Sequence, residues 1–269
     1  MKQLESIINI LENTKRILIL TGAGMSADSG IPTFRDEDGF WKGFSEHTVN
    51  FKNLANGHNM LKNPEKIWGF YEWRRRNCQK NKPHEGYFII NKILKKFEGF
   101  TKTTNTDGYH LRSGLSKDKI FEVHGSIWKL QCLDGYEKYT IENYDIPLCD
   151  LDEKTMLVNI NSIPKYKGKL LRPNILMFDD SYYIQNNNQI EKFNNFSEEE
   201  IDTIFLIGCD VGVPTNVLTA QRYKKKIESK IICINPNPDC CGKILIPDIY
   251  VNSTAKNALQ EIENNYDLS

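Results

Sequence analysis

The spacing of apolar side chains along the chain predicts alternating helices and strands. Residues 2–13 carry Leu and Ile at spacings of three and four, which is the period of a helix. An unbroken apolar run at 17–20 follows, and such a run is typical of a strand covered on both faces of a parallel sheet. Strands that alternate with helices indicate an α/β fold. Further buried strands are expected at 120–123, 175–178, 203–207 and 231–234, and helices at 64–78, 84–97, 215–228 and 254–264.

Three stretches do not follow this alternation. Residues 36–63 hold few apolar positions, and residues 133–170 mix Tyr, Asp, Asn and Lys without a clear period. We interpret both as insertions that build a small lobe beside the sheet. The Asn run at 186–188 and the Glu run that begins at 198 predict a surface loop.

The junction after the first predicted strand carries a glycine pattern. Gly22-x-Gly24-x-x-Ala27 has the spacing of a dinucleotide-binding turn, in which backbone N–H groups approach a pyrophosphate and a small third residue lets helix and strand pack closely. A purely structural turn explains the pattern equally well. The acidic residue expected about 20 positions later is missing, because residues 42–47 do not form a strand pattern.

Polar residues follow two other predicted strands. Asn105 and Asp107 come after an apolar stretch, and His124 ends the strand expected at 120–123. Ligands of open α/β sheets bind beyond the carboxyl ends of the strands, so these side chains would converge near Gly22. The alternatives are an Asx turn at Asn105 and Asp107 and a structural histidine.

Taken together, six collinear motifs resemble the sirtuins, the NAD-dependent protein deacylases, over essentially the whole chain. The motifs are Gly22-Ala-Gly-Met-Ser26, Ser29-Gly-Ile-Pro-Thr-Phe-Arg35, Thr104-Asn-Thr-Asp-Gly108, His124-Gly-Ser126, Leu171-Arg-Pro-Asn-Ile-Leu-Met-Phe178 and Ile234-Asn-Pro236. The resemblance implies a Rossmann-like parallel sheet with flanking helices and a smaller inserted lobe. It would be a single catalytic domain over 1–269, with its core at approximately 1–35, 84–127 and 171–269 and its lobe at approximately 36–83 and 128–170.

The resemblance also implies the roles of individual residues. NAD would be a consumed cosubstrate, with His124 as general base and with Asn105 and Asp107 lining the nicotinamide pocket. Ile175, Met177 and Phe178 would lie on an edge to which an extended acyl-lysine peptide of a partner protein adds as a strand. The residues implied to contact NAD are Gly22, Ala23, Gly24, Ser26, Pro32, Phe34, Arg35, Thr104, Asn105, Asp107, Gly208, Cys209, Asn235 and Ala255.

The implied reaction makes chemical sense of these residue types. The acyl oxygen of a modified lysine attacks the ribose carbon as nicotinamide leaves, and a histidine with a pKa near neutrality takes the proton of a ribose hydroxyl. The products would be nicotinamide, free lysine and an O-acyl-ADP-ribose. An NAD glycohydrolase or a mono-ADP-ribosyltransferase could use the same site. The presence of His124 favours deacylation, because only that route needs the hydroxyl deprotonated.

The chain departs from the family pattern at the structural zinc site. Most sirtuins carry two Cys-x-x-Cys pairs, whereas here Cys132 is followed by Gly135, and Ile163 and Tyr166 stand where the second pair would fall. Cys149 remains, but two thiolates do not complete a tetrahedral site. We therefore expect a divergent member that lacks most of the zinc cysteines and holds no metal. Packing of its tyrosines and Trp128 would then hold the lobe.

One feature bears on acyl preference. Tyr71 and Arg74 lie three apart on a predicted helix and so share a face. The pair is similar to the Tyr-x-x-Arg pair of sirtuins that remove succinyl, malonyl or glutaryl groups, and an arginine fork suits a carboxylate. The alternative is a solvated helix face, because Arg75 and Arg76 follow directly.

The balance of charged residues limits the kinds of partner that the chain is expected to bind. The 269 residues hold 35 Lys and Arg against 35 Asp and Glu, which argues against nucleic acid and anionic membranes as partners. The basic runs at 74–76 and 224–226 are interpreted as solvated helix faces. No apolar run reaches the 18 residues of a membrane span and no leader is evident, so we expect a cytoplasmic protein whose seven cysteines are thiols. The sequence leaves the oligomeric state open.

Overall fold

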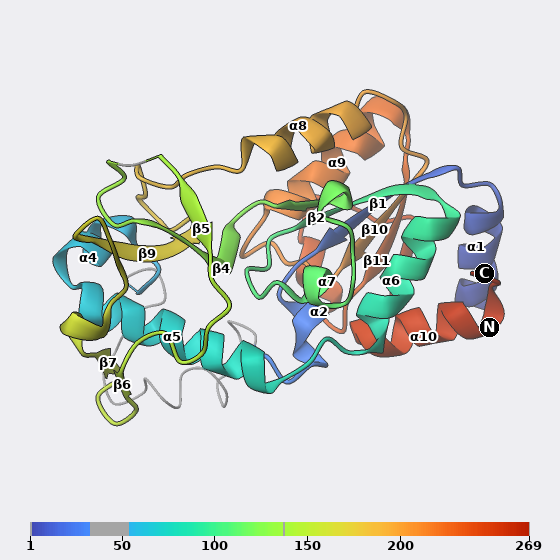
Figure 1. The fold of residues 1–269 in the computed structure, drawn as a ribbon. Helices are drawn as coiled ribbons and strands as arrows, with labels where there is room; N and C mark the ends of the chain where they lie inside the picture. The colour runs from blue at the N-terminus through green and yellow to red at the C-terminus, as the bar shows by residue number, and fades with distance from the viewer. Residues whose placement is uncertain (1, 33–53, 137, 269) are drawn as a thin grey trace.

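A six-stranded parallel sheet forms the centre of the larger part of the molecule. The structure is a computed structural model that describes residues 2–32, 54–136 and 138–268 (Figure 1). The strand order is β12-β11-β10-β1-β2-β3, and every neighbouring pair is parallel. The strands are β1 (Arg16–Thr21), β2 (Glu98–Thr103), β3 (Ile120–Glu122), β10 (Thr203–Ile207), β11 (Lys230–Ile234) and β12 (Ile249–Val251).

Helices cover both faces of this sheet, as Figure 1 shows. Successive residues of β1 point to opposite faces, so Ile17 and Ile19 join one hydrophobic core while Leu18 and Leu20 join the other. The unbroken apolar run therefore has the two-sided burial that the sequence predicts, and the α/β fold class is confirmed. One face carries α1 (Lys2–Glu12), α6 (Glu85–Lys96) and α10 (Ala255–Asn265), and the other carries α8 (Asn187–Phe196) and α9 (Thr215–Ile227).

The small lobe lies at the left of Figure 1 and is built around antiparallel strands. A four-stranded sheet of order β5-β4-β9-β8 stands beside the hairpin β6–β7, and α5 runs from the lobe toward the parallel sheet. The elements are α4 (Gly57–Lys62), α5 (Pro64–Lys80), β4 (Gly125–Cys132), β5 (Thr140–Glu142), β6 (Leu151–Asp152), β7 (Leu157–Val158), β8 (Lys165–Tyr166) and β9 (Lys169–Ile175).

Short helical turns complete the described chain. They are α2 (Gly24–Ala27), α7 (Tyr109–Arg112), η2 (Lys117–Lys119), η3 (Ile160–Ser162) and η4 (Pro238–Cys241). None of the helices in the described ranges is both long enough and apolar enough to span a membrane.

The predicted helices form close to their expected bounds because local signals fix their ends. Pro64 occupies the first turn of α5, where its missing N–H costs no hydrogen bond. The His84 side chain caps α6 by accepting from the Gly86 N–H, and Thr254 caps α10. The same kind of cap was overlooked at Asn186, whose side chain accepts from the Gln189 N–H. The predicted surface loop at 186–198 is therefore wrong, because it contains α8.

The strand predicted at 175–178 is also wrong in its bounds and its sheet. β9 ends at Ile175, which pairs with Gly125 in the antiparallel lobe sheet rather than in the parallel sheet. Beyond it Leu176 and Phe178 are 40% and 45% exposed. A short apolar run does not reveal which sheet it joins, since pairing partners are distant in sequence.

The basic run at 74–76 is not the solvated helix face that we expected. Arg75 is fully buried, and its guanidinium donates to the carbonyl oxygens of Ile127 (2.5 Å) and Asp145 (2.7 Å). It lies beside the equally buried Glu72 and over the ring of Trp128. The physical reason is that α5 packs against β4, whose loop carbonyls need donors inside the molecule.

Candidate functional site

The polar residues that follow the parallel strands gather at one edge of the sheet. Turns or loops leave β1, β2, β3, β10, β11 and β12 at their carboxyl ends, which face the same way because the strands are parallel. β1 lies between β2 and β10, so the chain leaves β1 to one side and returns on the other. Such a switch point is where ligands of open α/β sheets bind.

Two glycine turns cross closely at this switch point. The Gly22 N–H donates to the carbonyl of Ile207 and the Gly24 N–H donates to that of Gly208, both at 3.0 Å. A Cβ atom on Gly22 would lie 2.7 Å from the Gly208 oxygen, and one on Gly24 would lie 2.8 Å from the Gly208 Cα. Gly208 itself has a φ of +59°, and a Cβ there would lie 2.3 Å from the nitrogen of Met25. Only glycine fits this crossing.

A buried hydrogen-bond network lies beneath the first turn. The Ser26 hydroxyl donates to Asp107 at 2.6 Å, and the Asn105 amide donates to the Ser26 hydroxyl at 3.0 Å and to the Gly22 carbonyl at 2.9 Å. Because the Ser26 proton is directed at Asp107, the Tyr87 hydroxyl, 2.8 Å away, donates to Ser26. The structure thus brings together three residues that the sequence assigned to one pocket.

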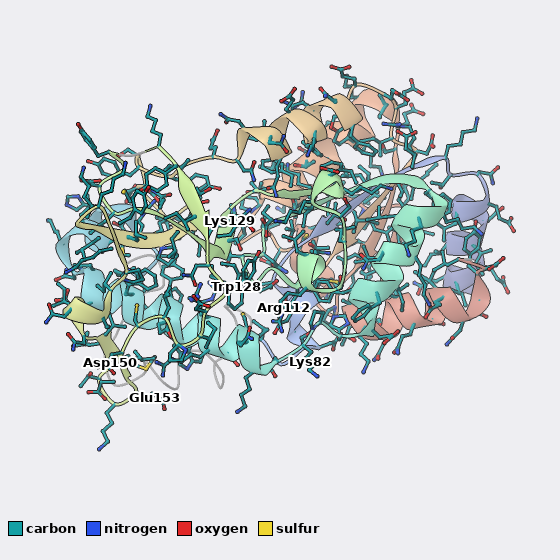
Figure 2. All side chains as sticks on the ribbon, in the orientation of Figure 1. Lys82, Arg112, Trp128, Lys129, Asp150 and Glu153 are labelled. Atoms are coloured by element: carbon teal, nitrogen blue, oxygen red, sulfur yellow. The ribbon has the colours of Figure 1, made fainter. Side chains whose placement is uncertain are left out.

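Asp107 is held from both ends. Its carboxylate accepts from the Tyr109 N–H at 2.9 Å, and its carbonyl accepts from the Trp128 indole at 2.6 Å. Burial raises the pKa of Asp107, and its hydrogen bonds from Ser26 and the Tyr109 backbone act in the opposite direction. Figure 2 shows Trp128 at the boundary between the lobe and the parallel sheet. The indole therefore ties the lobe to the pocket wall.

His124 lies where the chain passes from the parallel sheet into the lobe. It stands between β3 and β4, and its carbonyl accepts from the Leu176 N–H at 3.0 Å. Burial lowers the pKa of His124; a hydrogen bond with the Thr104 backbone opposes this, and the positive charge of Lys102 adds to it. The imidazole is therefore neutral at pH 7 and able to accept a proton.

The loops after β10, β11 and β12 form the other side of the edge. The Asn235 amide donates to the Cys209 carbonyl at 2.8 Å, which fastens the β11 loop to the β10 loop. Ala255 begins α10, and the next backbone N–H, of Lys256, donates to Asp28 at 2.8 Å. The predicted contacts Ala23 and Thr104 lie in the β1 and β2 turns.

Part of the expected cofactor loop is not described. Pro32 is half-buried at the end of the first described range, while Phe34 and Arg35 lie outside the described residues.

A model of the Sir2 family matches residues 22–215, which is more than half of the chain and includes both glycine turns, Asn105, Asp107 and His124. The chain belongs to the Sir2 family, the sirtuins.

Curated relatives and solved structures agree with this assignment. The chain is 32% identical over 248 residues to an NAD-dependent protein deacylase of Aquifex aeolicus, with 91% of this chain and 93% of that protein covered. It is 29% identical over 269 residues to an NAD-dependent protein deacylase of Candida albicans, with 85% of each covered. A solved complex of a Sir2 homologue with NAD superposes with a TM-score of 0.76 at 26% identity, covering 97% of this chain and 93% of that one.

The stretch predicted to receive a peptide strand makes contacts of its own in this sirtuin. Ile175 and Met177 are buried, whereas Phe178 is exposed. The Phe178 N–H donates to Ala55 at 2.7 Å, and its carbonyl accepts from Gly57 at 2.9 Å. The Leu176 N–H donates to His124 and the Met177 N–H donates to Asp180, so a strand that pairs here through N–H groups would have to replace bonds within the chain.

Tyr71 and Arg74 lie close to the buried pocket. Burial raises the pKa of Tyr71 to about 12, and the charge of Arg74 partly opposes the shift. The same Arg74 charge also acts on Asp107, where it lowers the pKa against the effect of burial. The Arg74 guanidinium therefore lies within electrostatic range of both Tyr71 and Asp107.

Sequence reasoning missed several residues that support the site. Tyr87 and Asn216 place polar groups in helices that otherwise pack by their apolar faces, and the Asn216 amide donates to the Thr21 carbonyl at 2.9 Å. His110 bonds the Thr21 hydroxyl at 2.9 Å. The sequence does show a polar residue at a core position of each helix. It does not show which group that residue bonds to.

The lobe positions of the expected zinc site are filled by packing. The Cys132 sulfur lies 3.6 Å from the Tyr139 hydroxyl, and the rings of Tyr139 and Tyr166 pack edge to face at 4.9 Å. Ile163 is buried, and so is Cys149.

The expectation that the chain holds no metal is nevertheless not supported. Among the described residues Cys233, Cys240 and Cys241 form a three-cysteine cluster with the geometry to hold an ion.

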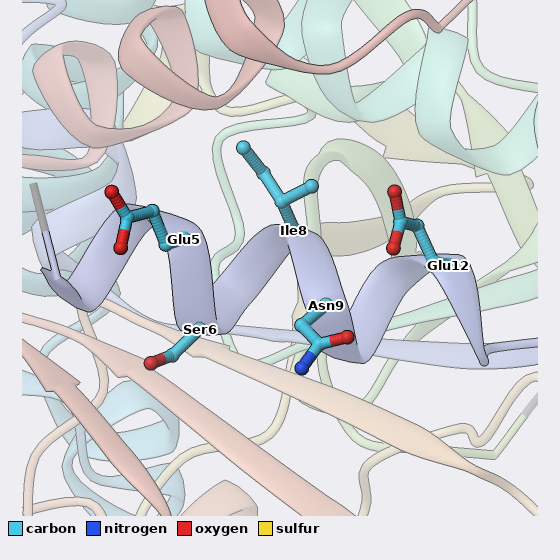
Figure 3. Close-up of a pocket in the computed structure, with 5 residues that line it drawn as sticks. All are labelled: Glu5, Ser6, Ile8, Asn9 and Glu12. Atoms are coloured by element: carbon cyan, nitrogen blue, oxygen red, sulfur yellow. The ribbon is translucent and has the colours of Figure 1, made fainter.

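A separate hollow on the molecule carries no part of this site. It lies along the outer face of α1 (Figure 3) and is lined by Glu5, Ser6, Ile8, Asn9 and Glu12. Its residues come from one exposed helix and include none of the predicted site residues.

Proposed function

We propose that this Sir2 family member is an NAD-dependent protein-lysine deacylase that transfers the acyl group to ADP-ribose and releases nicotinamide. The observation that carries the proposal is the buried Asn105–Ser26–Asp107 network under the glycine crossing, beside which stands His124 after β3, with a pKa that burial lowers. The relatives named above are deacylases of this type.

The crossing fits the pyrophosphate of NAD. Gly22 and Gly24 lie in the turn at the switch point, at the start of α2, and this turn would receive the pyrophosphate. The loops of Cys209, Asn235 and Ala255 would hold the adenosine half, with Asn235 orienting its loop through Cys209. NAD supplies a ribose carbon from which a neutral nicotinamide departs.

The buried network orients the nicotinamide end. Asn105 and Asp107 are fixed by Ser26 and by backbone groups, so their remaining polar surface is directed into the pocket without rearrangement. Burial lowers the pKa of His124 and so favours its neutral imidazole, whose unprotonated ring nitrogen would take the proton of a ribose hydroxyl. An acyl-lysine peptide would enter along Ile175, Met177 and Phe178.

Mass spectrometry of NAD with the purified protein tests the proposal, with and without peptides that carry acetyl-, succinyl- or longer acyl-lysine. We expect nicotinamide release that depends on peptide and is matched by O-acyl-ADP-ribose. Release of free ADP-ribose without peptide would instead identify an NAD glycohydrolase, and a peptide that gains one ADP-ribose would identify a transferase. Either result would overturn the deacylase proposal while leaving NAD as the substrate.

We also propose that the protein prefers acyl groups that end in a carboxylate. Tyr71 is buried and Arg74 is half-buried on α5, and the charge of Arg74 acts on both Tyr71 and Asp107. Arg74→Lys keeps the charge but loses the bidentate fork. We expect the ratio of kcat/KM for succinyl over acetyl peptide to fall about tenfold or more in Arg74→Lys. An unchanged ratio would show that the pair does not select the acyl group, and Arg76→Lys is the matched control.

We further propose one catalytic domain whose core and lobe follow the expected division, with a lobe that needs no four-cysteine zinc site. Ile163 and Tyr166 stand where the family's second cysteine pair would fall; Ile163 is buried and the Tyr166 ring packs on Tyr139. Cys132→Ser and Cys149→Ser should keep their secondary structure and lose about 1–2 kcal/mol of unfolding free energy at most. Unfolding of the lobe in either variant would contradict this.

A further inference from the structure

Three buried sulfur atoms meet behind the loops at the β10 and β11 ends of the sheet. Cys233 lies in β11, and Cys240 and Cys241 lie in η4 just after it. The sulfur of Cys233 is 3.6 Å from that of Cys240 and 3.8 Å from that of Cys241, and the last two are 3.8 Å apart. None of the three side chains is more than 5% exposed.

The fold brings the sulfurs together by two separate devices. Alternation along β11 directs Cys233 to the face covered by α9, because Ile232 and Ile234 point to the opposite core. The chain then turns back at η4, where the Val211 N–H donates to the Cys240 carbonyl at 2.9 Å. The turn is thus bonded to the β10 loop on one side while its sulfurs face β11 on the other.

The separations of the three sulfurs fit a metal ion. A single buried cysteine behaves as a small hydrophobic residue, but packing alone does not direct three sulfurs of one turn and one strand at a common point. Tetrahedral zinc with Zn–S bonds of about 2.3 Å places its sulfurs about 3.8 Å apart. The observed separations of 3.6–3.8 Å are those of one face of this tetrahedron.

We propose that the three-cysteine cluster binds one zinc ion, with the fourth coordination position left to a ligand from outside the cluster. Binding releases the three thiol protons to solvent, and the zinc charge offsets most of the thiolate charge in the buried site. The site is distinct from the lobe cysteines Cys132 and Cys149.

The ion would have a structural consequence for the neighbouring loops. Zinc would fasten η4 to β11, and η4 is bonded in turn to the β10 loop through Val211. Asn235, which follows β11, bonds the same loop at Cys209. Both loops would therefore be less mobile with zinc bound, and the protein would be more stable against unfolding.

Metal analysis of the purified full chain tests the proposal without any activity assay. Protein prepared with zinc in the medium and passed over a desalting column should carry about one zinc per chain. Cys240→Ser and Cys241→Ser should each lose most of it, while Cys132→Ser and Cys149→Ser should keep it. A chain without stoichiometric metal, one that carries copper instead, or zinc that is lost only in the lobe variants would overturn the assignment.

A second readout keeps the test valid if a cluster variant folds poorly. Wild-type protein stripped by a chelator and reloaded with Co²⁺ should show the thiolate-to-cobalt absorption of a tetrahedral site, and its Tm should rise when Zn²⁺ is returned. Stripped protein that gives neither the cobalt spectrum nor the rise in Tm would contradict the proposal. Cys78→Ser, at a buried thiol elsewhere in the core, is the control for the loss of any single cysteine.

Discussion

The carboxyl edge of the parallel sheet and the small lobe are ordered by different kinds of contact. At the edge, backbone meets backbone where Gly24 crosses Gly208, and short polar side chains bond to main-chain groups. In the lobe, large side chains fill the space: Arg75 binds carbonyl groups, Trp128 stacks on Tyr144, and tyrosine rings pack on each other.

Because of this difference, the two regions should tolerate different substitutions. A backbone crossing has no side chain that can move aside, so the edge allows few substitutions. A lobe held by side-chain volume can exchange one filling group for another. We therefore expect substitutions at Ile163 and Tyr166 in the lobe to be tolerated better than substitutions at Gly22 or Gly208.

The largest effect on stability should come from Arg75 in the lobe. Arg75→Met would remove the buried ion-pair partner of Glu72 and leave it Arg76 and the Leu148 N–H. Removing one member of a buried pair costs about 3–5 kcal/mol, and denaturant unfolding should show a loss of this size. Arg76→Met, at a partly exposed position, should cost about 1 kcal/mol. Equal losses for the two variants would show that burial of Arg75 does not organise the lobe.

A smaller effect should separate two glycines that share a left-handed backbone. Gly208→Ala adds a Cβ 2.3 Å from the Met25 nitrogen and should cost about 2–4 kcal/mol, with a marked loss of NAD affinity. Gly168→Ala in the lobe has a φ of +78° but nothing within 4 Å of the added atom. Gly168→Ala should cost only the strain of a left-handed backbone, about 1–2 kcal/mol. Denaturant unfolding and NAD calorimetry on both variants make the comparison. Equal losses of unfolding free energy would show that the close backbone crossing at Gly208 adds nothing to stability.

A third effect should appear as a dependence of stability on pH. Burial lowers the pKa of His110 to about 3, and the charge of His84 contributes. The unfolded chain, with a histidine pKa of about 6.5, binds this proton more readily. Above about pH 6.5 His110 is neutral in both states, and burying it carries no protonation penalty. As pH falls toward 3, the free energy of unfolding decreases by up to about 1.4 kcal/mol per pH unit, because only the unfolded chain binds the proton. His110→Gln should flatten the decline between about pH 6 and 4, and an unchanged slope would show that other groups cause it.

The sequence predicts the edge better than the lobe for a physical reason. Gly22, Gly24 and Asn105 act through backbone geometry and short-range turns, which leave a local pattern that a reader can recognise. Arg75 was assigned to solvent because its partners, the carbonyls of Ile127 and Asp145, lie 52 and 70 residues away along the chain. Long-range pairing of this kind leaves no local mark.

The same limit applies to the remaining errors. The three-cysteine cluster was not predicted, because its sulfurs come together only where η4 folds back against β11. The strand predicted at 175–178 failed for a related reason, since its partner in β4 lies some 50 residues earlier and belongs to a different sheet. Helix ends, by contrast, were predicted well where Pro64 and Thr254 mark them, because capping is local.

The most direct test of the account is to measure NAD binding and deacylation together in His124→Ala. His124 follows β3 at the carboxyl edge of the sheet, whereas other residues form the glycine crossing and the buried network. NAD affinity should therefore stay within a few-fold of wild type while the deacylation rate falls about 100- to 10,000-fold. His58→Ala, at an exposed histidine of α4, should change neither quantity. Loss of NAD binding together with the rate would show that His124 is structural, and a rate that survives would place the general base elsewhere.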